Sequence, residues 1–392
     1  MVRFLENCKS CAVAASTILF LAIGCGTGHS HDTRAVQPRS TPSSASPSAT
    51  GYAKRADFLT GVVCMSARMC VAVGWYYYGA AGPSLTLATR WNGRTWLAQP
   101  TPSQGHDSRL GDISCASASF CIAVGAPAEA WAGTRWTVIP PAGPVAGVSC
   151  PATGSCQAVG PPPGRRPVAA RWDGRTWQAE PVPGPMPAPQ SLALAGVSCT
   201  SARFCMAVGD ASRSAGARPS PALRDRTLAE IWNGARWRIA RTPNPARQSE
   251  LSGVSCTSSM ACTAVGSSAA GKWTLVERWN GVRWAIQHTP NISHIGYTAL
   301  TAVSCASPTD CTAVGTYDGG VGIAEQWNGT VWTIRRLPSP GGAPGASPDV
   351  VPVSVSCTSA TACMTVGTTQ NKTLAERWNG SRWTVEPTPN PA

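Results

Sequence analysis

Residues 357–383 read CTSATACMTVGTTQNKTLAERWNGSRW. Two cysteines separated by five residues are followed by a short strand-like segment, and an Asn-Gly pair stands between two tryptophans. Similar units occur seven times, with cysteines at 64/70, 115/121, 150/156, 199/205, 256/262, 305/311 and 357/363 and tryptophans at 91/96, 131/136, 172/177, 232/237, 279/284, 327/332 and 378/383. Both spacings are the same in every copy, which indicates a protein built from repeats.

Each repeat contains four short segments with the composition of β-strands. In the last repeat they are the segment ending at Cys357, Cys363–Gly367, Leu374–Trp378 and the segment beginning at Trp383. Gly, Asn and Pro lie between such segments, as expected for turns. Four-stranded units of about 40–50 residues are typical of β-propellers. We therefore predict an all-β fold, a seven-bladed β-propeller over residues 57–392.

Fourteen of the 17 cysteines belong to the C-x5-C pairs. Two cysteines in this spacing can face each other across a hairpin, at a distance that suits a disulfide. No His or second C-x-x-C accompanies the pairs, so a metal site is not expected. We predict one disulfide per blade: Cys64–Cys70, Cys115–Cys121, Cys150–Cys156, Cys199–Cys205, Cys256–Cys262, Cys305–Cys311 and Cys357–Cys363.

The paired tryptophans are predicted to be core residues. Across an Asn-Gly hairpin, both tryptophans of a repeat lie on the same face of the sheet. There each can bury about 150–250 Å² against the next blade; a sugar-binding ladder of aromatic side chains is the alternative. Glutamates recur two residues before the first tryptophan, and we expect structural carboxylates paired with Arg or backbone: Glu129, Glu230, Glu277, Glu325 and Glu376.

The turn sequence adds a family resemblance. Arg171–Trp177 reads RWDGRTW and resembles the Asp-box, a motif of the hairpin between the third and fourth strands of propeller blades. Most copies have Asn in place of Asp, and Trp replaces the Ser that opens the motif. Residues 57–390 as a whole resemble the secreted, repeat-built propellers of high-GC bacteria. The resemblance implies the fold and export but no activity, because Asp-boxes occur in sialidases and in sorting receptors alike.

The first part of the chain has the composition of an export signal. Residues 1–24 have a basic start and an apolar run too short to span a bilayer, which predicts a signal peptide. The run ends LAIGC, which resembles a bacterial lipobox except for Ala22, where Leu is usual. This resemblance implies a lipid on Cys25 that tethers the protein to the membrane at the cell surface. Secretion without a lipid is the alternative.

Residues 25–56 contain the sequence TPSSASPSAT and few apolar side chains. Such a segment cannot bury enough surface to fold, so we predict a disordered stalk between anchor and propeller. The formal net charge is +13, but no run of five or six like charges occurs. We therefore expect no nucleic-acid partner, and we expect a monomer.

No catalytic motif is found. The chain has five histidines without metal-ligand spacing, and it lacks a Gly-x-Ser-x-Gly, a P-loop and a dinucleotide fingerprint. We assign no catalytic, metal or cofactor residue. A secreted hydrolase or lyase acting on polysaccharide is the alternative to a binding function, and it would need an acid/base pair near the axis.

Loop lengths indicate where a ligand could bind. In an up-and-down blade, the turns after the first and third strands lie on one face, here called the disulfide face. The other connections lie on the opposite face, here called the variable face, because all differences in length fall there: the second Cys and first Trp are 10 residues apart in one blade and 27 in another. Variable loops on a rigid scaffold often bind ligands, although insertions can also be merely tolerated.

Trp75, Tyr76, Tyr77 and Tyr78 stand out on the variable face. Such a group of aromatic side chains suits a glycan or a protein partner. Alternatively, the segment extends the second strand and packs against a neighbouring blade. The sequence thus predicts an extracytoplasmic binding or scaffold module that holds a glycan or a protein on its variable face.

Overall fold

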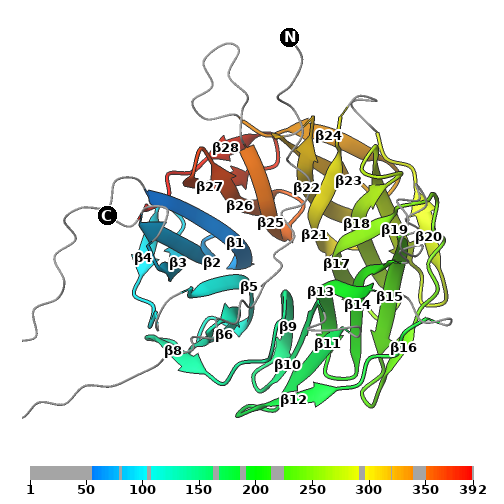
Figure 1. Cartoon of the computed structure of the whole chain (residues 1–392). Helices are drawn as coiled ribbons and strands as arrows, with labels where there is room; N and C mark the ends of the chain where they lie inside the picture. Colours follow the sequence, from blue (N-terminus) through cyan, green and yellow to red (C-terminus); the bar gives the residue numbers. More distant parts are fainter. Residues whose placement is uncertain are drawn as a thin grey trace, which may run out of the picture. The chain divides into compact units, whose positions relative to one another are not determined.

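The computed structural model describes residues 55–78, 82–103, 107–161, 167–185, 191–212, 225–290, 296–318, 320–338 and 350–390. The predicted signal peptide, Cys25 and all but the end of the predicted stalk lie outside these segments. The described strands form seven antiparallel four-stranded sheets arranged in a ring (Figure 1). This confirms the predicted seven-bladed β-propeller. No helix in these segments is long and apolar enough to cross a membrane.

Each blade consists of four consecutive strands, ordered from the axis outward. The innermost strands are β1 Arg55–Ser66, β5 Arg109–Ser117, β9 Gly147–Ala152, β13 Ser191–Ser201, β17 Glu250–Ser258, β21 Ala299–Ser307 and β25 Val350–Ser359. The second strands are β2 Met69–Tyr78, β6 Phe120–Ala126, β10 Ser155–Gly160, β14 Phe204–Ser212, β18 Ala261–Ser268, β22 Asp310–Tyr317 and β26 Ala362–Thr369. The third strands are β3 Ser84–Trp91, β7 Ala128–Trp131, β11 Val168–Trp172, β15 Arg226–Trp232, β19 Trp273–Trp279, β23 Val321–Trp327 and β27 Lys372–Trp378. The outer strands are β4 Trp96–Gln99, β8 Trp136–Ile139, β12 Trp177–Glu180, β16 Trp237–Ile239, β20 Trp284–Gln287, β24 Trp332–Arg336 and β28 Trp383–Val385.

The repeated cysteines and glycines have clear structural roles. Cys64 and Cys70 are cross-strand partners joined by a disulfide, and the same holds in the other six blades, so the seven predicted disulfides are confirmed. In the turn between the third and fourth strands, Asn92 Oδ1 accepts hydrogen bonds of 2.9 Å from the N–H groups of Arg94 and Thr95. Gly93 there has a φ of 95°, which favours glycine.

The serine of the Val-Ser-Cys segment links neighbouring blades. Ser255 Oγ accepts a hydrogen bond of 3.0 Å from the backbone N–H of Cys305 in the next blade. Equivalent bonds of 2.9 Å join Ser114 to Cys150, Ser149 to Cys199, Ser198 to Cys256, Ser304 to Cys357 and Ser356 to Cys64. Blade 1 has Val63 at this position. A repeated residue on the innermost strand is therefore part of a ring of contacts between blades.

We expect Ser255→Ala to lower the free energy of unfolding by about 1–2 kcal/mol, because the partly buried N–H of Cys305 loses its acceptor. Ser259→Ala is the matched control, since Ser259 lies exposed in a turn of the same blade. Denaturant unfolding with the disulfides intact measures both. Equal stability of the two variants would show that the serine bond contributes nothing.

The ring closes between blades 7 and 1 without a strand shared between them. The N–H of Val62 donates to Ser354 Oγ at 3.2 Å. The N–H of Asp57 donates to the carbonyl oxygen of Asn371 at 3.0 Å. Side chains of blade 7, including Val366, also share a core cluster with blade 1. Closure therefore depends on the same kinds of contact that join the other blades.

The two tryptophans of each blade are direct cross-strand partners, with ring centroids 5.3–5.8 Å apart. They share one face of the sheet, as predicted. However, the prediction that they pack against the next blade is wrong. Trp131 and Trp136 of blade 2 share a core cluster with Val71 and Val73 of blade 1, the preceding blade. Strand alternation decides which residues share a face, but the direction in which blades follow one another decides which neighbour that face contacts.

The five repeated glutamates lie between blades and are 0% exposed: Glu129, Glu230, Glu277, Glu325 and Glu376. The predicted pairing with Arg or backbone is wrong. Glu230 and Glu376 have no hydrogen-bond partner among the described residues, and Glu277 accepts a 3.4 Å bond from Thr227 of the preceding blade. Burial raises the pKa of Glu129 to about 7 and that of the other four to about 8. The four carboxyl groups with a pKa of about 8 are therefore largely protonated at neutral pH.

Candidate ligand-binding site

The predicted aromatic segment Trp75–Tyr78 lies within a strand at the variable face. Strands β1 and β2 have 12 and 10 residues, and their pairing continues from Leu59 opposite Gly74 to Arg55 opposite Tyr78. The segment thus extends the second strand, which was the alternative to a loop. The side chain of Tyr78 is outside the described part.

Strand alternation separates the other three aromatic side chains. Tyr76 packs against the core cluster between blades 7 and 1, which includes Leu59 and Val366. Trp75 and Tyr77 point to the other side of the sheet. Phe58, the cross-strand partner of Trp75 on β1, joins them there. The structure therefore brings together two of the four predicted residues and adds one that the sequence reasoning missed.

Phe58, Trp75, Tyr77 and Arg109 form what we call the aromatic cluster. The ring centroids of Phe58 and Trp75 are 4.3 Å apart with an interplanar angle of 24°, and those of Trp75 and Tyr77 are 5.7 Å apart. Arg109 of blade 2 places its Cζ 4.3 Å from the centroid of the Trp75 ring. Stacked rings and cation–π pairs contribute about 0.5–1.5 kcal/mol each. All three rings are only partly buried, so the cluster is ordered and still reachable from solvent.

Two polar contacts position the side chain of Arg109. Its Nε donates a hydrogen bond of 3.1 Å to Ser84 Oγ, and its Nη2 lies 3.9 Å from Asp107, whose side chain is 80% exposed. Such an exposed ion pair contributes little. Arg109 is six residues before Cys115, and Phe58 is six residues before Cys64. Aligning the repeats on their cysteines would have shown that both residues lie at the rim of the variable face, where the innermost strands of adjacent blades begin.

The same rim position in blade 5 is Glu250. Its Oε1 accepts hydrogen bonds from Ser267 Oγ at 3.0 Å and from Tyr297 Oη at 3.2 Å. Burial, together with the negative charges of Glu250 and Asp225, raises the pKa of Asp210 to about 6. The rim of the variable face is therefore aromatic and cationic at blades 1 and 2 but acidic at blades 4 and 5.

A channel of about 290 Å³ follows the axis of the ring and is lined by the innermost strands of all seven blades. Asp112 is the only ionisable residue among those that line it. Its Oδ2 accepts a hydrogen bond of 2.9 Å from the N–H of Val148, and burial raises its pKa to about 6. The lining thus contains one carboxylate, whereas the glycosidase mechanism uses two. No group of three potential metal ligands occurs in the described segments.

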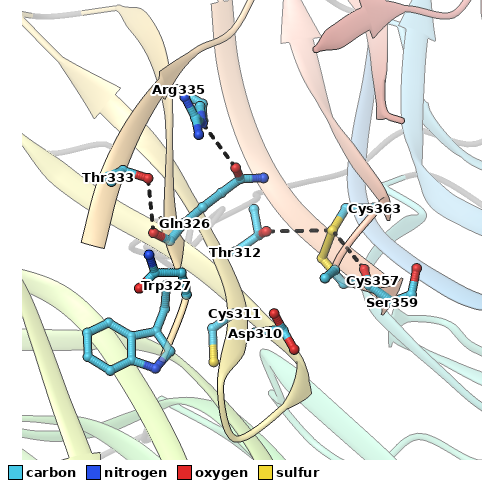
Figure 2. Close-up of a pocket in the computed structure, with 12 residues that line it drawn as sticks. Asp310, Cys311, Thr312, Gln326, Trp327, Thr333, Arg335, Cys357, Ser359 and Cys363 are labelled. Atoms are coloured by element: carbon cyan, nitrogen blue, oxygen red, sulfur yellow. Dashed lines mark hydrogen bonds between the residues drawn. A yellow bond between two sulfur atoms is a disulfide. The ribbon is translucent and has the colours of Figure 1, made fainter. Parts of the chain in front are cut away.

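Figure 2 shows a smaller pocket, of about 190 Å³, between blades 6 and 7 near the disulfide face. Arg335 Nε donates to Gln326 Oε1 at 3.3 Å, and Thr312 Oγ1 lies 3.6 Å from Cys363 Sγ. An equivalent pocket of about 270 Å³ lies between blades 7 and 1. Ligand pockets usually have about 300–1,000 Å³, so these two are seams between packed blades and not candidate sites.

Comparison with known proteins supports the fold. No protein-family model matches the chain, and no curated protein sequence matches it. A solved structure of YCF48 bound to D1 peptide is 15% identical, with a TM-score of 0.50 over 82% of this chain and 92% of that one. A chain of the mitotic checkpoint complex is 10% identical (TM-score 0.52, 88% and 98% covered), and so is a fucose-specific lectin from Aleuria aurantia (TM-score 0.50, 85% and 97% covered). At such low identity these structures share the propeller fold with this chain and indicate no particular ligand.

Proposed function

We propose that this protein is an extracytoplasmic binding module that holds a protein partner on its variable face, while a lipid on Cys25 tethers it to the membrane. The seven disulfides support an oxidising compartment, because such bonds rarely persist in the cytosol. The signal-like residues 1–24 and the lipobox-like sequence that ends at Cys25 support export and anchoring.

The observation that carries the binding proposal is the aromatic cluster. Trp, Tyr and Arg are the residues most enriched at the energetic centres of protein interfaces, and here all three occur together, partly exposed, on strands of the adjacent blades 1 and 2. Because the rings of the cluster are already stacked, these side chains lose little conformational entropy when a partner binds.

The geometry favours a protein over a glycan. A sugar ring stacks on a free aromatic face, but Phe58 and the Arg109 guanidinium both lie 4.3 Å from the centre of the Trp75 ring. Together with the Tyr77 ring, whose centroid is 5.7 Å away, these two groups leave little of the Trp75 ring surface free for a sugar. The ring edge, Tyr77 and the exposed edge of Arg109 remain, and these suit apolar and carboxylate side chains.

We expect Trp75→Ala and Arg109→Ala each to weaken binding of the captured partner by about 30-fold or more, as for residues at the centre of an interface. The partner is first captured by cross-linking on intact cells that export the protein. The Kd of the purified partner is then measured for the wild type and for each variant. Leu97→Ala is the matched control, because Leu97 is 54% exposed on the outer strand of the same blade. Unchanged Kd values for both site variants would overturn the proposal, and a glycan that binds with the same residue dependence would replace the protein as ligand.

A further inference from the structure

Arginine side chains gather on the disulfide face. The turn between the third and fourth strands carries an arginine in six of the seven blades, and the turn between the first and second strands carries one in two blades. We call these eight residues the turn arginines: Arg94, Arg135, Arg175, Arg236, Arg283, Arg382, Arg68 and Arg203. Along the chain they are far apart, but the up-and-down topology brings all of them to one end of the disc.

The turn arginines are free to interact. All eight are exposed, and none forms an ion pair with any described residue. Asp173 is the one acidic residue in the same turns, and Asp310 begins strand β22 directly after such a turn. Asp173 accepts hydrogen bonds from the N–H groups of Arg175 and Thr176, and Asp310 accepts one from Ser307 Oγ. Eight arginines against two carboxylates therefore give the disulfide face a clear net positive charge.

This face is also level. Its two kinds of turn keep the same length in all seven blades, whereas every insertion of the chain falls on the variable face. A surface that accepts no insertion, and whose charges lie around the whole ring, matches a flat partner better than a linear one. A linear polyanion would need its contacts along a single path.

Apolar side chains accompany the charges. Met260, Val282 and Val331 are 61%, 79% and 53% exposed, and they lie in the same turns of blades 5 and 6. Exposed apolar residues among arginines are the composition with which peripheral proteins contact the boundary between headgroups and acyl chains. A dissolved polyanion would gain nothing from these three side chains.

We propose that the disulfide face docks onto a membrane surface rich in anionic lipid headgroups. The turn arginines supply the attraction, since each cationic side chain near such a surface contributes about 1 kcal/mol, or about a fivefold change in partition. The apolar residues of blades 5 and 6 enter the interface. Docking on this face leaves the variable face, with its aromatic cluster, turned away from the bilayer.

Co-sedimentation with vesicles tests this proposal, using residues 51–392, which form one compact unit and lack Cys25. We expect binding to phosphatidylcholine vesicles that contain about 30% phosphatidylglycerol, loss of binding without the anionic lipid, and weakening in about 0.5 M salt. Replacing four turn arginines by Gln should lower the partition coefficient by about 600-fold: Arg94, Arg236, Arg283 and Arg382.

The matched control removes the same charge from the other face by replacing four exposed variable-face residues with Gln: Arg241, Arg247, Lys272 and Lys372. It should retain most of the wild-type binding. Equal loss in both variants would overturn the proposal, because only net charge would then matter. Binding to heparin or nucleic acid but not to anionic vesicles would also overturn it. A combined Met260→Ser and Val282→Ser variant should bind several-fold more weakly at unchanged charge.

Discussion

Glu230→Gln is expected to leave stability nearly unchanged at pH 5 and to stabilise the protein by up to about 4 kcal/mol at pH 8. Glu230 is fully buried, neither of its carboxyl oxygens has a hydrogen-bond partner among the described residues, and burial raises its pKa from 4.5 to about 8. The substitution replaces a buried acid with a neutral side chain of the same size. The stability difference between wild type and variant depends on pH because only Glu230 has a proton to lose: it is released when the chain unfolds and must be taken up again when the chain folds. Gln carries no such proton.

The sign follows from proton binding. Between pH 4.5 and pH 8 the folded protein keeps the Glu230 proton, whereas the unfolded chain releases it. The unfolded state then binds fewer protons, so the wild type loses about 1.4 kcal/mol of stability per pH unit from this one group. Glu376, with the same burial and no partner among the described residues, should behave alike.

Melting temperatures of wild type and variant from pH 5 to pH 9, with the disulfides intact, measure this effect. Asp107→Asn serves as the control, because the side chain of Asp107 is 80% exposed and its removal should give a difference that hardly changes with pH. A constant difference between wild type and Glu230→Gln across the whole range would contradict the prediction and would mean that solvent reaches the carboxyl group.

Trp136→Ala is expected to lower the free energy of unfolding by about 3–5 kcal/mol. Trp136 is 4% exposed, packs against Val71 and Val73 of the preceding blade, and donates from Nε1 to Gln99 Oε1 of that blade at 3.2 Å. Removing it opens a cavity between two blades and also removes the aromatic contact with Trp131, whose ring is tilted by 52° and has its centroid 5.7 Å away.

A graded series separates these contributions. Trp136→Phe keeps most of the buried area and should cost about 1–2 kcal/mol, mainly for the lost hydrogen bond and volume. Val282→Ala should change stability by less than about 0.5 kcal/mol, because Val282 is 79% exposed. Guanidinium chloride unfolding under oxidising conditions measures the three variants. A small effect of Trp136→Ala would indicate that adjacent blades move together to fill the space.

The two faces of the propeller differ in composition and in the roles proposed for them. The disulfide face has turns of constant length, eight exposed arginines and three exposed apolar side chains. The variable face has the aromatic cluster at blades 1 and 2 and acidic groups at blades 4 and 5. The prediction that a ligand binds on the variable face followed from loop lengths alone. The disulfide face became a candidate surface only because the fold brings the turn arginines together there.

Most of the fold could be predicted from the sequence, because each feature depends on residues close together in the chain. The hairpin that joins Cys64 and Cys70 and the turn at Asn92 and Gly93 are local, so spacing and residue type were sufficient. The partial success at the candidate site has the same cause. Trp75 was found because it lies beside three tyrosines, whereas Arg109 lies more than 30 residues away.

The sequence by itself determined the number of blades, the strands, the disulfides and the pairing of tryptophans, since repetition and strand alternation are properties of the chain. Only the tertiary structure decided that the tryptophans contact the preceding blade, that Glu230 is buried without a partner among the described residues, and that the turn arginines share one face. These properties depend on the closure of the ring. Closure sets the neighbours of each sheet and brings to one surface charges that the sequence spaces dozens of residues apart.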